Sequence, residues 1–380
     1  VAWIVVCGAV VLMEWNIYPE SYLFYASMLT RILFTPHGLG ILGAMLLTAG
    51  FLATASRLVR PNPILLIVAL PLYLFAVVSK GPIWMEQKHV WLRVPLGRAV
   101  QASIHERERF GWSVTGGADA ASFQVTHRLH DVLGQTPDAA LPQKVMVFMM
   151  ESWGERGNDL EVMRRRLMKT PGVDSVASGY DRYRGSTLPG EVRELCGARL
   201  DFSNPKALGG GCLPKRFASL GYRTTAFHGY EGIFYSRDVI YPALGFKKVY
   251  FKRDLKKASL CGGAFPGRCD DETAALALEQ AAKPGPQFTY MMTLSAHAFV
   301  DPATVRRPYV AANPTGLKDG SDGQKLDRAL IFQIVQQAAA DPALRGATLY
   351  FSGDHNPPEE AAMLGLPDSE TPFFLVKLKS

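Results

Sequence analysis

TLYFSGDHNPP, residues 348–358, joins a run of strand-forming residues to an adjacent aspartate and histidine. Thr348–Ser352 suits a buried strand, Gly353 ends it, and two prolines stop the chain soon after Asp354 and His355. Gly, Asp, Asn and Pro are also ordinary turn residues, so this stretch alone is equally consistent with a loop. The rest of the chain decides between a loop and a functional strand end.

Three other runs of strand length also finish in a residue suited to chemistry. These runs and the residues that follow them are KVMVFMM (144–150) with Glu151, TTAF (224–227) with His228, and YMMTLSA (290–296) with His297. Helical patterns lie between the strands, at DDETAALALEQAAK (270–283) and DRALIFQIVQQAAA (327–340). Strands that alternate with helices predict an α/β domain with a mainly parallel sheet between helices.

The strand ends predict a metal site at one edge of that sheet. In an open parallel sheet, ligands bind at the carboxyl ends of the strands, so these carboxylates and imidazoles converge. Asp, Glu and His are ligands for a divalent cation, and such a site needs a nucleophile or water beside the ion.

The candidate nucleophile lies in YRGSTLPGEVRELCG, residues 183–197, where Ser186 and Thr187 precede a helical pattern from Glu191. A hydroxyl in that place is commonly just an N-cap. We interpret Glu191 as a charge near the helix N-terminus and not as a catalytic residue.

Five motifs occur in a fixed order: FMMESWG (148–154), GSTLPGE (185–191), FHGYEGIFYSRDVIYPALGF (227–246), TLSAH (293–297) and SGDH (352–355). In this order they resemble the alkaline phosphatase superfamily. Within it, the chain is similar to membrane-anchored lipoteichoic acid synthases and to the phosphoglycerol transferases of osmoregulated glucans. The resemblance covers about residues 144–380. LCG (195–197) followed by GCLPKRFASLGYRTTAF (211–227) resembles the glucan enzymes in particular.

The resemblance implies a role for each residue of the site. Glu151, Thr187, Asp354 and His355 would bind one divalent metal ion, with Mn²⁺ favoured and Zn²⁺ as the alternative. Thr187 would also be the nucleophile. His297 would act in catalysis and in headgroup binding, and the other headgroup positions match His228, Tyr235 and Arg237. Phe234-Tyr235 stands where lipoteichoic acid synthases have Phe-Trp, which leaves the headgroup open.

The function that this resemblance favours is transfer of phosphoglycerol from phosphatidylglycerol to an exported glycan, through a phospho-threonine intermediate. One alternative keeps the site and moves phosphoethanolamine to lipid A or a glycan, with Glu231 as the nearby carboxylate for the amine. A second alternative is a metal-dependent phosphatase or sulfatase, although STLPGEVR lacks the Cys/Ser-x-Pro-x-Arg spacing of sulfatases. A third, a non-enzymatic membrane sensor, conflicts with the intact ligand set.

The first 80 residues predict transmembrane helices. Apolar runs cover Val1–Met13, Gly38–Ala55 and Pro63–Ser79, and the last two approach the roughly 20 residues that span a bilayer. The short loop Ser56–Asn62 carries Arg57 and Arg60, and such loops stay in the cytoplasm. Everything after Lys80 is then on the periplasmic or extracellular side. Ser21–Phe34, which carries Arg31, is interpreted as interfacial.

We therefore predict three parts: a transmembrane region (1–80), a juxtamembrane connector with an interfacial helix (81–141), and an exported catalytic domain (142–380). Trp84 and Trp91 beside basic residues indicate the interfacial helix. The net charge of +7, from 41 Lys+Arg and 34 Asp+Glu, suits anionic lipid or phosphate. No nucleic-acid motif is present.

Cysteine positions agree with an exported domain. Cys7 lies in an apolar run, whereas the other four lie in the part predicted to be exported. An even number there suits two disulfides, because no CxxC pair supports a zinc cluster. The spacings of 16, 49 and 8 predict the bridges Cys196–Cys212 and Cys261–Cys269, with Cys7 free.

Overall fold

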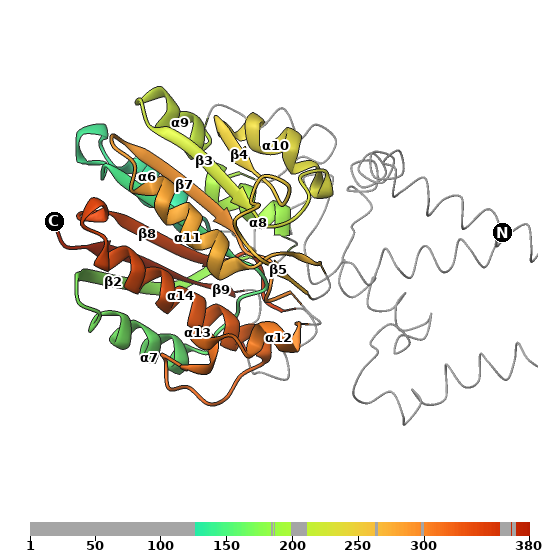
Figure 1. The fold of residues 1–380 in the computed structure, drawn as a ribbon. Coiled ribbons are helices and arrows are strands. Elements are labelled where there is room, and N and C mark those ends of the chain that lie inside the picture. The colour runs from blue at the N-terminus through green and yellow to red at the C-terminus, as the bar shows by residue number, and fades with distance from the viewer. Residues whose placement is uncertain are drawn as a thin grey trace, which may run out of the picture. The chain divides into compact units, whose positions relative to one another are not determined.

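The computed structural model describes residues 126–183, 185, 187–198, 211–262, 265–297, 300–357, 366 and 370–380 (Figure 1). The chain divides into two compact units, Val1–Gln124 and Val125–Ser380, and the described residues all belong to the second. The predicted transmembrane region, the interfacial helix and Cys7 lie outside the described residues. Within the described part, no helix is both long and apolar enough to cross a membrane.

A seven-stranded sheet in the order β2-β9-β8-β1-β7-β3-β4 forms the centre of this unit. Its strands are β1 (Lys144–Met150), β2 (Val173–Arg182), β3 (Arg223–His228), β4 (Lys248–Tyr250), β7 (Gln287–Met292), β8 (Thr348–Gly353) and β9 (Glu370–Leu378). Within this sheet β9 runs antiparallel to both of its neighbours, β2 and β8, and the pairs among β8, β1, β7, β3 and β4 are parallel. The predicted mainly parallel α/β sheet is confirmed. A separate two-stranded sheet pairs β5 (Leu260–Cys261) with β6 (Gly267–Arg268).

Helices form two groups that contact different parts of the sheet (Figure 1). One group is α7 (Gly157–Leu167), α11 (Asp270–Ala281) and α14 (Asp322–Ala340), with the short α12 (Pro302–Val305) and α13 (Pro308–Ala311) beside α14. The other group is α6 (Arg128–Gln135), α8 (Thr187–Cys196), α9 (Leu213–Ser219) and α10 (Arg237–Leu244). The described residues of the unit also contain the 3₁₀ turns η5 (Asp138–Ala140), η7 (Phe234–Ser236) and η8 (Pro342–Leu344).

The strands are continuous apolar runs because both faces of the sheet are covered. All seven residues of β1 are buried. Met146, Phe148 and Met150, which share one face, belong to the core cluster formed with α7, α11 and α14. Phe148 stacks on Phe351 of β8, with ring centroids 5.1 Å apart. A parallel sheet buried on both sides therefore explains the pattern in the sequence.

The structure joins part of the predicted connector to the catalytic unit. Helix α6 precedes residue 142, yet it contacts α8 and α9 and buries Leu129 and Leu133. The main-chain N–H of Leu129 donates to Glu194 Oε2 at 3.0 Å. The compact unit that contains the sheet thus includes α6, which lies ahead of residue 142.

Both predicted disulfides are confirmed. Cys196 at the end of α8 bonds to Cys212 just before α9, and Cys261 bonds to Cys269. Their sequence separations are 16 and 8 residues. Loops of this size restrict the unfolded chain by about 2–3 kcal/mol each in the chain-entropy treatment. The first bridge fixes the end of α8 that is remote from Thr187.

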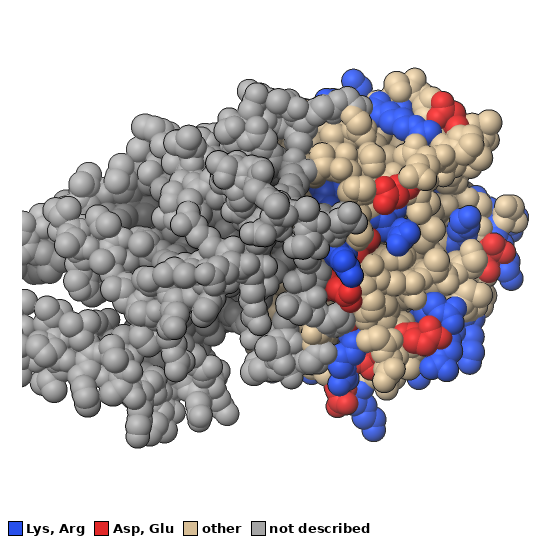
Figure 2. Space-filling view, turned by 180° about the vertical axis from the view of Figure 1, so that it is seen from behind, with Lys and Arg blue, Asp and Glu red and all other residues tan. Residues whose placement is uncertain are grey.

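Charged side chains of both signs are interspersed on the described surface seen from behind (Figure 2). Among the described residues, Arg164 and Glu161 form one exposed pair of this kind, with Nε and Oε2 2.7 Å apart. Such exposed pairs contribute little to stability.

Candidate active site

The carboxyl ends of β1, β7, β3 and β8 lie at one level of the sheet, because their registers match. Met149 pairs with both Met292 and Ser352, and His228 also pairs with Met292. Figure 1 shows these strands running side by side toward the same edge. Glu151 and Asp354 follow their strands at this edge, as the sequence predicts. The strand β7 ends at Met292, earlier than the sequence suggested, so Thr293 and not His297 follows it directly.

Main-chain hydrogen bonds hold the two carboxylates in place. The N–H of Glu151 donates to Thr293 Oγ1 at 2.8 Å, which ties β1 to β7. The N–H groups of Ser152 and His355 both donate to Asp354 Oδ1 at 2.7 Å. Ser152 adopts a positive φ of 54°, a conformation that costs a non-glycine residue on the order of 1–3 kcal/mol and is found at functional sites. The strand ends therefore form a rigid carboxylate pair.

Helix α8 brings Thr187 to this pair. Thr187 is the first residue of the helix, and its Oγ1 lies 3.3 Å from His355 Nε2 and 3.5 Å from Glu151 Oε2. The close approach depends on Gly190, because a Cβ there would lie 2.5 Å from the carbonyl oxygen of Asp354. The helix begins four residues earlier than the sequence suggested, at Thr187 instead of Glu191, and places the hydroxyl at its N-terminus.

Four side chains at this edge fit a divalent metal ion. Ligand atoms of Glu151, Asp354 and His355 all lie within 4.8 Å of one another. Asp354 is fully buried, and its Oδ2 has no hydrogen-bond partner in the described part of the chain. His355 Nδ1 lies 2.9 Å from the carbonyl oxygen of Asn356, an arrangement that leaves Nε2 as the ligand atom. Two carboxylates, an imidazole and a hydroxyl are a suitable donor set.

The pKa shifts of the candidate ligands also fit a bound cation. Burial, together with the nearby Glu151, raises the pKa of Asp354 to about 7. Burial also raises the pKa of Glu151. Burial disfavours the charged form of His355, but Asp354 and Glu151 outweigh it and raise the pKa of the imidazole. Two buried carboxylates that face each other are costly, and a bound cation would offset that cost.

Arg237, a predicted headgroup residue, lies in a buried ion pair with Glu191. Its Nη2 and Nε lie 2.8 and 3.1 Å from Glu191 Oε1, and both side chains are fully buried. Glu191 Oε2 accepts from the hydroxyls of Tyr241 and Tyr290, at 2.5 and 2.7 Å. The Nε–Nη2 edge of the guanidinium therefore faces a carboxylate of the protein and is not available as a bidentate fork for phosphate.

The sequence indicated that Glu191 is a charge near the helix N-terminus, but in the structure it is buried and paired with Arg237. It lies in the second turn of α8 but is buried under the site, where it joins the helix of Thr187 to α10 and β7. Its position four residues after Thr187, on the same face of the helix, was the signal in the sequence. Its partners come from distant segments, so the pairing itself had no sequence signal.

His228 lies buried at the end of β3. Its Nδ1 is 3.3 Å from the carbonyl oxygen of Met292, while Nε2 has no hydrogen-bond partner among the described residues. Burial, reinforced by Arg237, lowers the pKa of His228 well below its usual value. The ring is therefore neutral, with Nδ1 as the donor and Nε2 as an acceptor.

Tyr235 and His297, the remaining predicted residues, are connected by an aromatic cluster that the sequence reasoning missed. The cluster consists of Tyr230, Phe234 and Phe265, all of them partly exposed. The His297 ring packs on Phe265 at 4.7 Å, Phe265 contacts Phe234 at 5.2 Å, and Phe234 contacts Tyr235 at 4.8 Å. The Arg237 guanidinium carbon lies 5.0 Å from the centre of the Tyr235 ring.

We expect Glu191→Gln to destabilise the protein and to weaken substrate binding, because it leaves the buried Arg237 without a counter-charge. Breaking a buried ion pair costs on the order of 3–5 kcal/mol, and an isosteric amide retains part of the hydrogen bonding. Urea denaturation of the full chain measures the loss, and Glu279→Gln, on the exposed face of α11, is the matched control. Equal stability of the two variants would contradict this account of Arg237.

Comparisons with known proteins identify similar chains. The family model for sulfatases matches residues 170–370. Among solved structures, lipoteichoic acid synthase LtaP from Listeria monocytogenes is 18% identical, with 65% of this chain and 70% of that chain covered and a TM-score of 0.45. Phosphoglycerol transferase GacH from Streptococcus pyogenes, in complex with sn-glycerol-1-phosphate, is 17% identical, with coverages of 66% and 72% and a TM-score of 0.44. The periplasmic domain of EcEptC from Escherichia coli is 12% identical, with coverages of 64% and 75% and a TM-score of 0.42. A search of curated proteins found no match.

Proposed function

Because this chain belongs to the sulfatase family, within the alkaline phosphatase superfamily, we propose that it is a membrane-bound phosphoglycerol transferase. It takes phosphoglycerol from phosphatidylglycerol and passes it to an exported glycan. The observation that carries the proposal is the place of Thr187 Oγ1, at a helix N-terminus and 3.3–3.5 Å from two candidate metal ligands. The acceptor glycan is left open.

The chemistry takes two displacement steps at phosphorus. In the first, Thr187 Oγ1 loses its proton and bonds to the phosphorus of phosphatidylglycerol, while the bond to the diacylglycerol oxygen breaks and that oxygen gains a proton. In the second, a glycan hydroxyl loses its proton and attacks the same phosphorus, and the Thr187 oxygen leaves and is protonated. Two displacements keep the phosphoglycerol group intact, whereas water in the second step would make the protein a hydrolase.

The residues around Thr187 supply what this reaction needs. A divalent cation, Mn²⁺ by preference and Zn²⁺ as the alternative, would be held by Glu151, Thr187, Asp354 and His355, where it would lower the pKa of the hydroxyl and offset phosphate charge. The N–H groups of the first turn of α8 face negative charge developing at its N-terminus. His297 is proposed to assist proton transfer and to contact the headgroup.

The donor is proposed from the chemistry of the headgroup residues. A glycerol headgroup is neutral and needs hydrogen-bond partners, and the neutral His228 offers its Nε2 as an acceptor. Tyr235 offers a phenol, and Arg237 supplies positive charge for the phosphate. The partly exposed Tyr230, Phe234 and Phe265 offer apolar surface for the acylglycerol part of a lipid.

Phosphoethanolamine is the weaker alternative, because an ammonium group needs a carboxylate or an aromatic cage. Glu231, the carboxylate three residues after His228, is 48% exposed, and its Oε1 lies 3.9 Å from Lys252 Nζ. A sulfatase activity is disfavoured because STLPGEVR has no Cys or Ser followed at the required spacing by Pro and Arg. The predicted transmembrane region and the exported location belong to the proposal, since the donor is a membrane lipid.

We expect the purified full chain to release diacylglycerol faster from phosphatidylglycerol vesicles than from phosphatidylethanolamine vesicles. Arg237→Ala should slow both reactions by roughly 10–150-fold, the value of one hydrogen bond to a charged group. Tyr235→Phe should slow the phosphatidylglycerol reaction by about 2–10-fold, through loss of one neutral hydrogen bond. It should affect the phosphatidylglycerol reaction more than the phosphatidylethanolamine reaction. Tyr250→Phe, on edge strand β4, is the control. Preferential turnover of phosphatidylethanolamine would overturn the donor assignment and leave the Thr187 chemistry standing.

A further inference from the structure

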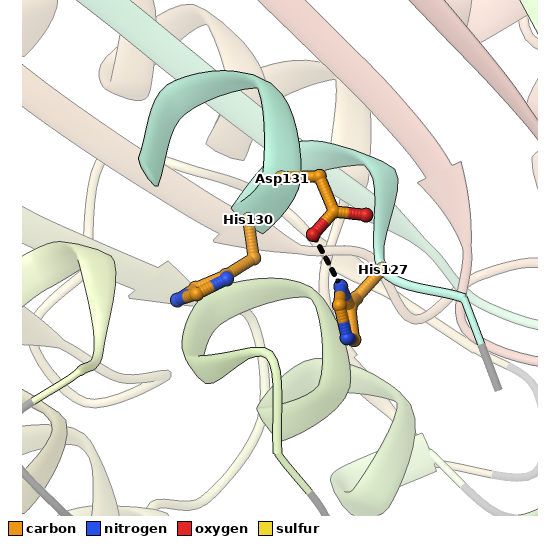
Figure 3. A group of neighbouring side chains, drawn as sticks. All are labelled: His127, His130 and Asp131. Atoms are coloured by element: carbon orange, nitrogen blue, oxygen red, sulfur yellow. Dashed lines mark ion pairs between the residues drawn. The ribbon is translucent and has the colours of Figure 1, made fainter. Parts of the chain in front are cut away.

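A second group of metal-ligating side chains lies at the start of α6, among residues for which the sequence showed no pattern. His127, His130 and Asp131 each offer one ligand atom, and these atoms all lie within 4.8 Å of one another (Figure 3). His127 Nδ1 lies 2.9 Å from Asp131 Oδ1, and the two imidazole centroids are 5.7 Å apart. The i, i+3 and i+4 spacing explains the convergence, because these positions share one face of a helical turn.

The hydrogen bond of His130 prepares its ring for a metal. His130 Nε2 lies 2.9 Å from the carbonyl oxygen of Gly211, so this nitrogen carries the proton and donates. The lone pair is then on Nδ1, the nitrogen that Figure 3 shows on the side of the other two residues. An imidazole that donates one N–H to a main-chain carbonyl and offers its other nitrogen is the usual arrangement of a ligating histidine. Gly197 packs against the ring on the side of Nδ1, where a Cβ would not fit.

The charge and exposure of the group also fit a cation. In the described part of the chain, no lysine or arginine forms an ion pair with Asp131, and its carboxylate faces His127. The side chains of His127 and Asp131 are 30% and 41% exposed, so an ion from solvent can reach them. By contrast, the group Cys269, Asp271 and Glu272 is already satisfied, by the disulfide and by Arg307.

We propose that His127, His130 and Asp131 form a second divalent metal site that prefers Zn²⁺ to Mn²⁺. Two imidazoles and one carboxylate suit Zn²⁺, whereas the site at Thr187 has mostly oxygen donors. Zinc bonds of about 2.0–2.2 Å require ligand atoms closer together than 4.8 Å, so the side chains close around the ion by rotation. Water completes the coordination.

The position of this site gives it a structural role. Gly211, whose carbonyl accepts from His130, precedes Cys212 of the disulfide to Cys196, the last residue of α8. The N–H of Leu129, one residue before His130, donates to Glu194 on the same helix. Bound zinc would therefore order the first turn of α6, including the His130 ring that donates to Gly211 next to this disulfide. It stabilises the folded chain and does not take part in the chemistry.

The test separates the two sites by removing the one at Thr187. The metal-free full chain carrying Asp354→Ala is titrated with Zn²⁺ and with Mn²⁺ by calorimetry, and bound metal is counted by elemental mass spectrometry after desalting. We expect one equivalent of Zn²⁺ and no tightly bound Mn²⁺. Co²⁺ added in place of Zn²⁺ should show visible absorption bands of a nitrogen-ligated ion. Absence of a bound equivalent of Zn²⁺ in this protein overturns the proposal without any further variant.

Second variants identify the ligands. Adding His130→Gln or Asp131→Asn should weaken Zn²⁺ binding by more than the 10–100-fold that loss of an outer partner typically costs. Gln135→Ala, one turn further along α6 and exposed, should leave the affinity unchanged. The Zn²⁺-dependent rise in melting temperature should disappear with the ligands and persist in the control. Retention of the zinc equivalent in both ligand variants would assign it elsewhere and overturn the site.

Discussion

Thr187→Ala is expected to abolish release of diacylglycerol and to prevent formation of any covalent phosphoglycerol adduct. Loss of the nucleophile should reduce kcat by at least about 10⁴-fold, as loss of a covalent nucleophile does in hydrolytic enzymes. The side chain is buried and its hydroxyl lies within 3.5 Å of Glu151 and His355, so alanine removes the attacking atom while the helix keeps its place.

The measurement is intact-protein and peptide mass spectrometry after brief incubation with phosphatidylglycerol vesicles. The wild type should carry the mass of phosphoglycerol on the peptide that contains Thr187, and the alanine variant should carry none. Thr187→Ser keeps a hydroxyl at the same position and is the matched control, with activity within about tenfold of the wild type because only a methyl group is lost. An adduct that persists in the alanine variant would place the nucleophile elsewhere.

Asp354→Asn is expected to remove the metal of the active site and, with it, the activity. Asp354 Oδ1 accepts the N–H groups of Ser152 and His355, and an asparagine carbonyl oxygen can keep both bonds. Oδ2, the buried oxygen without a hydrogen-bond partner among the described residues, becomes an amide nitrogen that cannot ligate. The change thus separates metal binding from the architecture of the strand ends.

Bound Mn²⁺, counted by elemental mass spectrometry and by paramagnetic resonance of the titrated protein, should fall by at least about 100-fold in affinity, since an inner ligand matters more than an outer partner. Mn²⁺ is the probe because the group at His127 favours Zn²⁺. Asp322→Asn, at the start of α14 and exposed, is the control. Unchanged Mn²⁺ affinity in Asp354→Asn would refute the ligand set.

The sequence alone determined the sheet and the residues at its edge. Strands buried on both faces require unbroken apolar runs, and such runs are visible at 144–150, 287–292 and 348–353 without any knowledge of their neighbours. Parallel strands end at a common edge, so Glu151 and Asp354 were predictable as neighbours although more than 200 residues separate them. The two disulfides were predictable because the cysteines of each pair lie close together along the chain.

Only the tertiary structure decided which buried charges pair. From the sequence, Glu191 is indistinguishable from an ordinary charge near a helix N-terminus. It is the partner of Arg237, Tyr241 and Tyr290 because α8, α10 and β7 pack together. The pairing of His130 with the carbonyl of Gly211 likewise depends on where Gly211, just before α9, lies against α6. A group far along the chain, a side chain for Glu191 and a main-chain carbonyl for His130, supplies the second charge or hydrogen bond in each case. Periodicity and spacing report which faces are buried, but they carry no information about the partner across the packed interface.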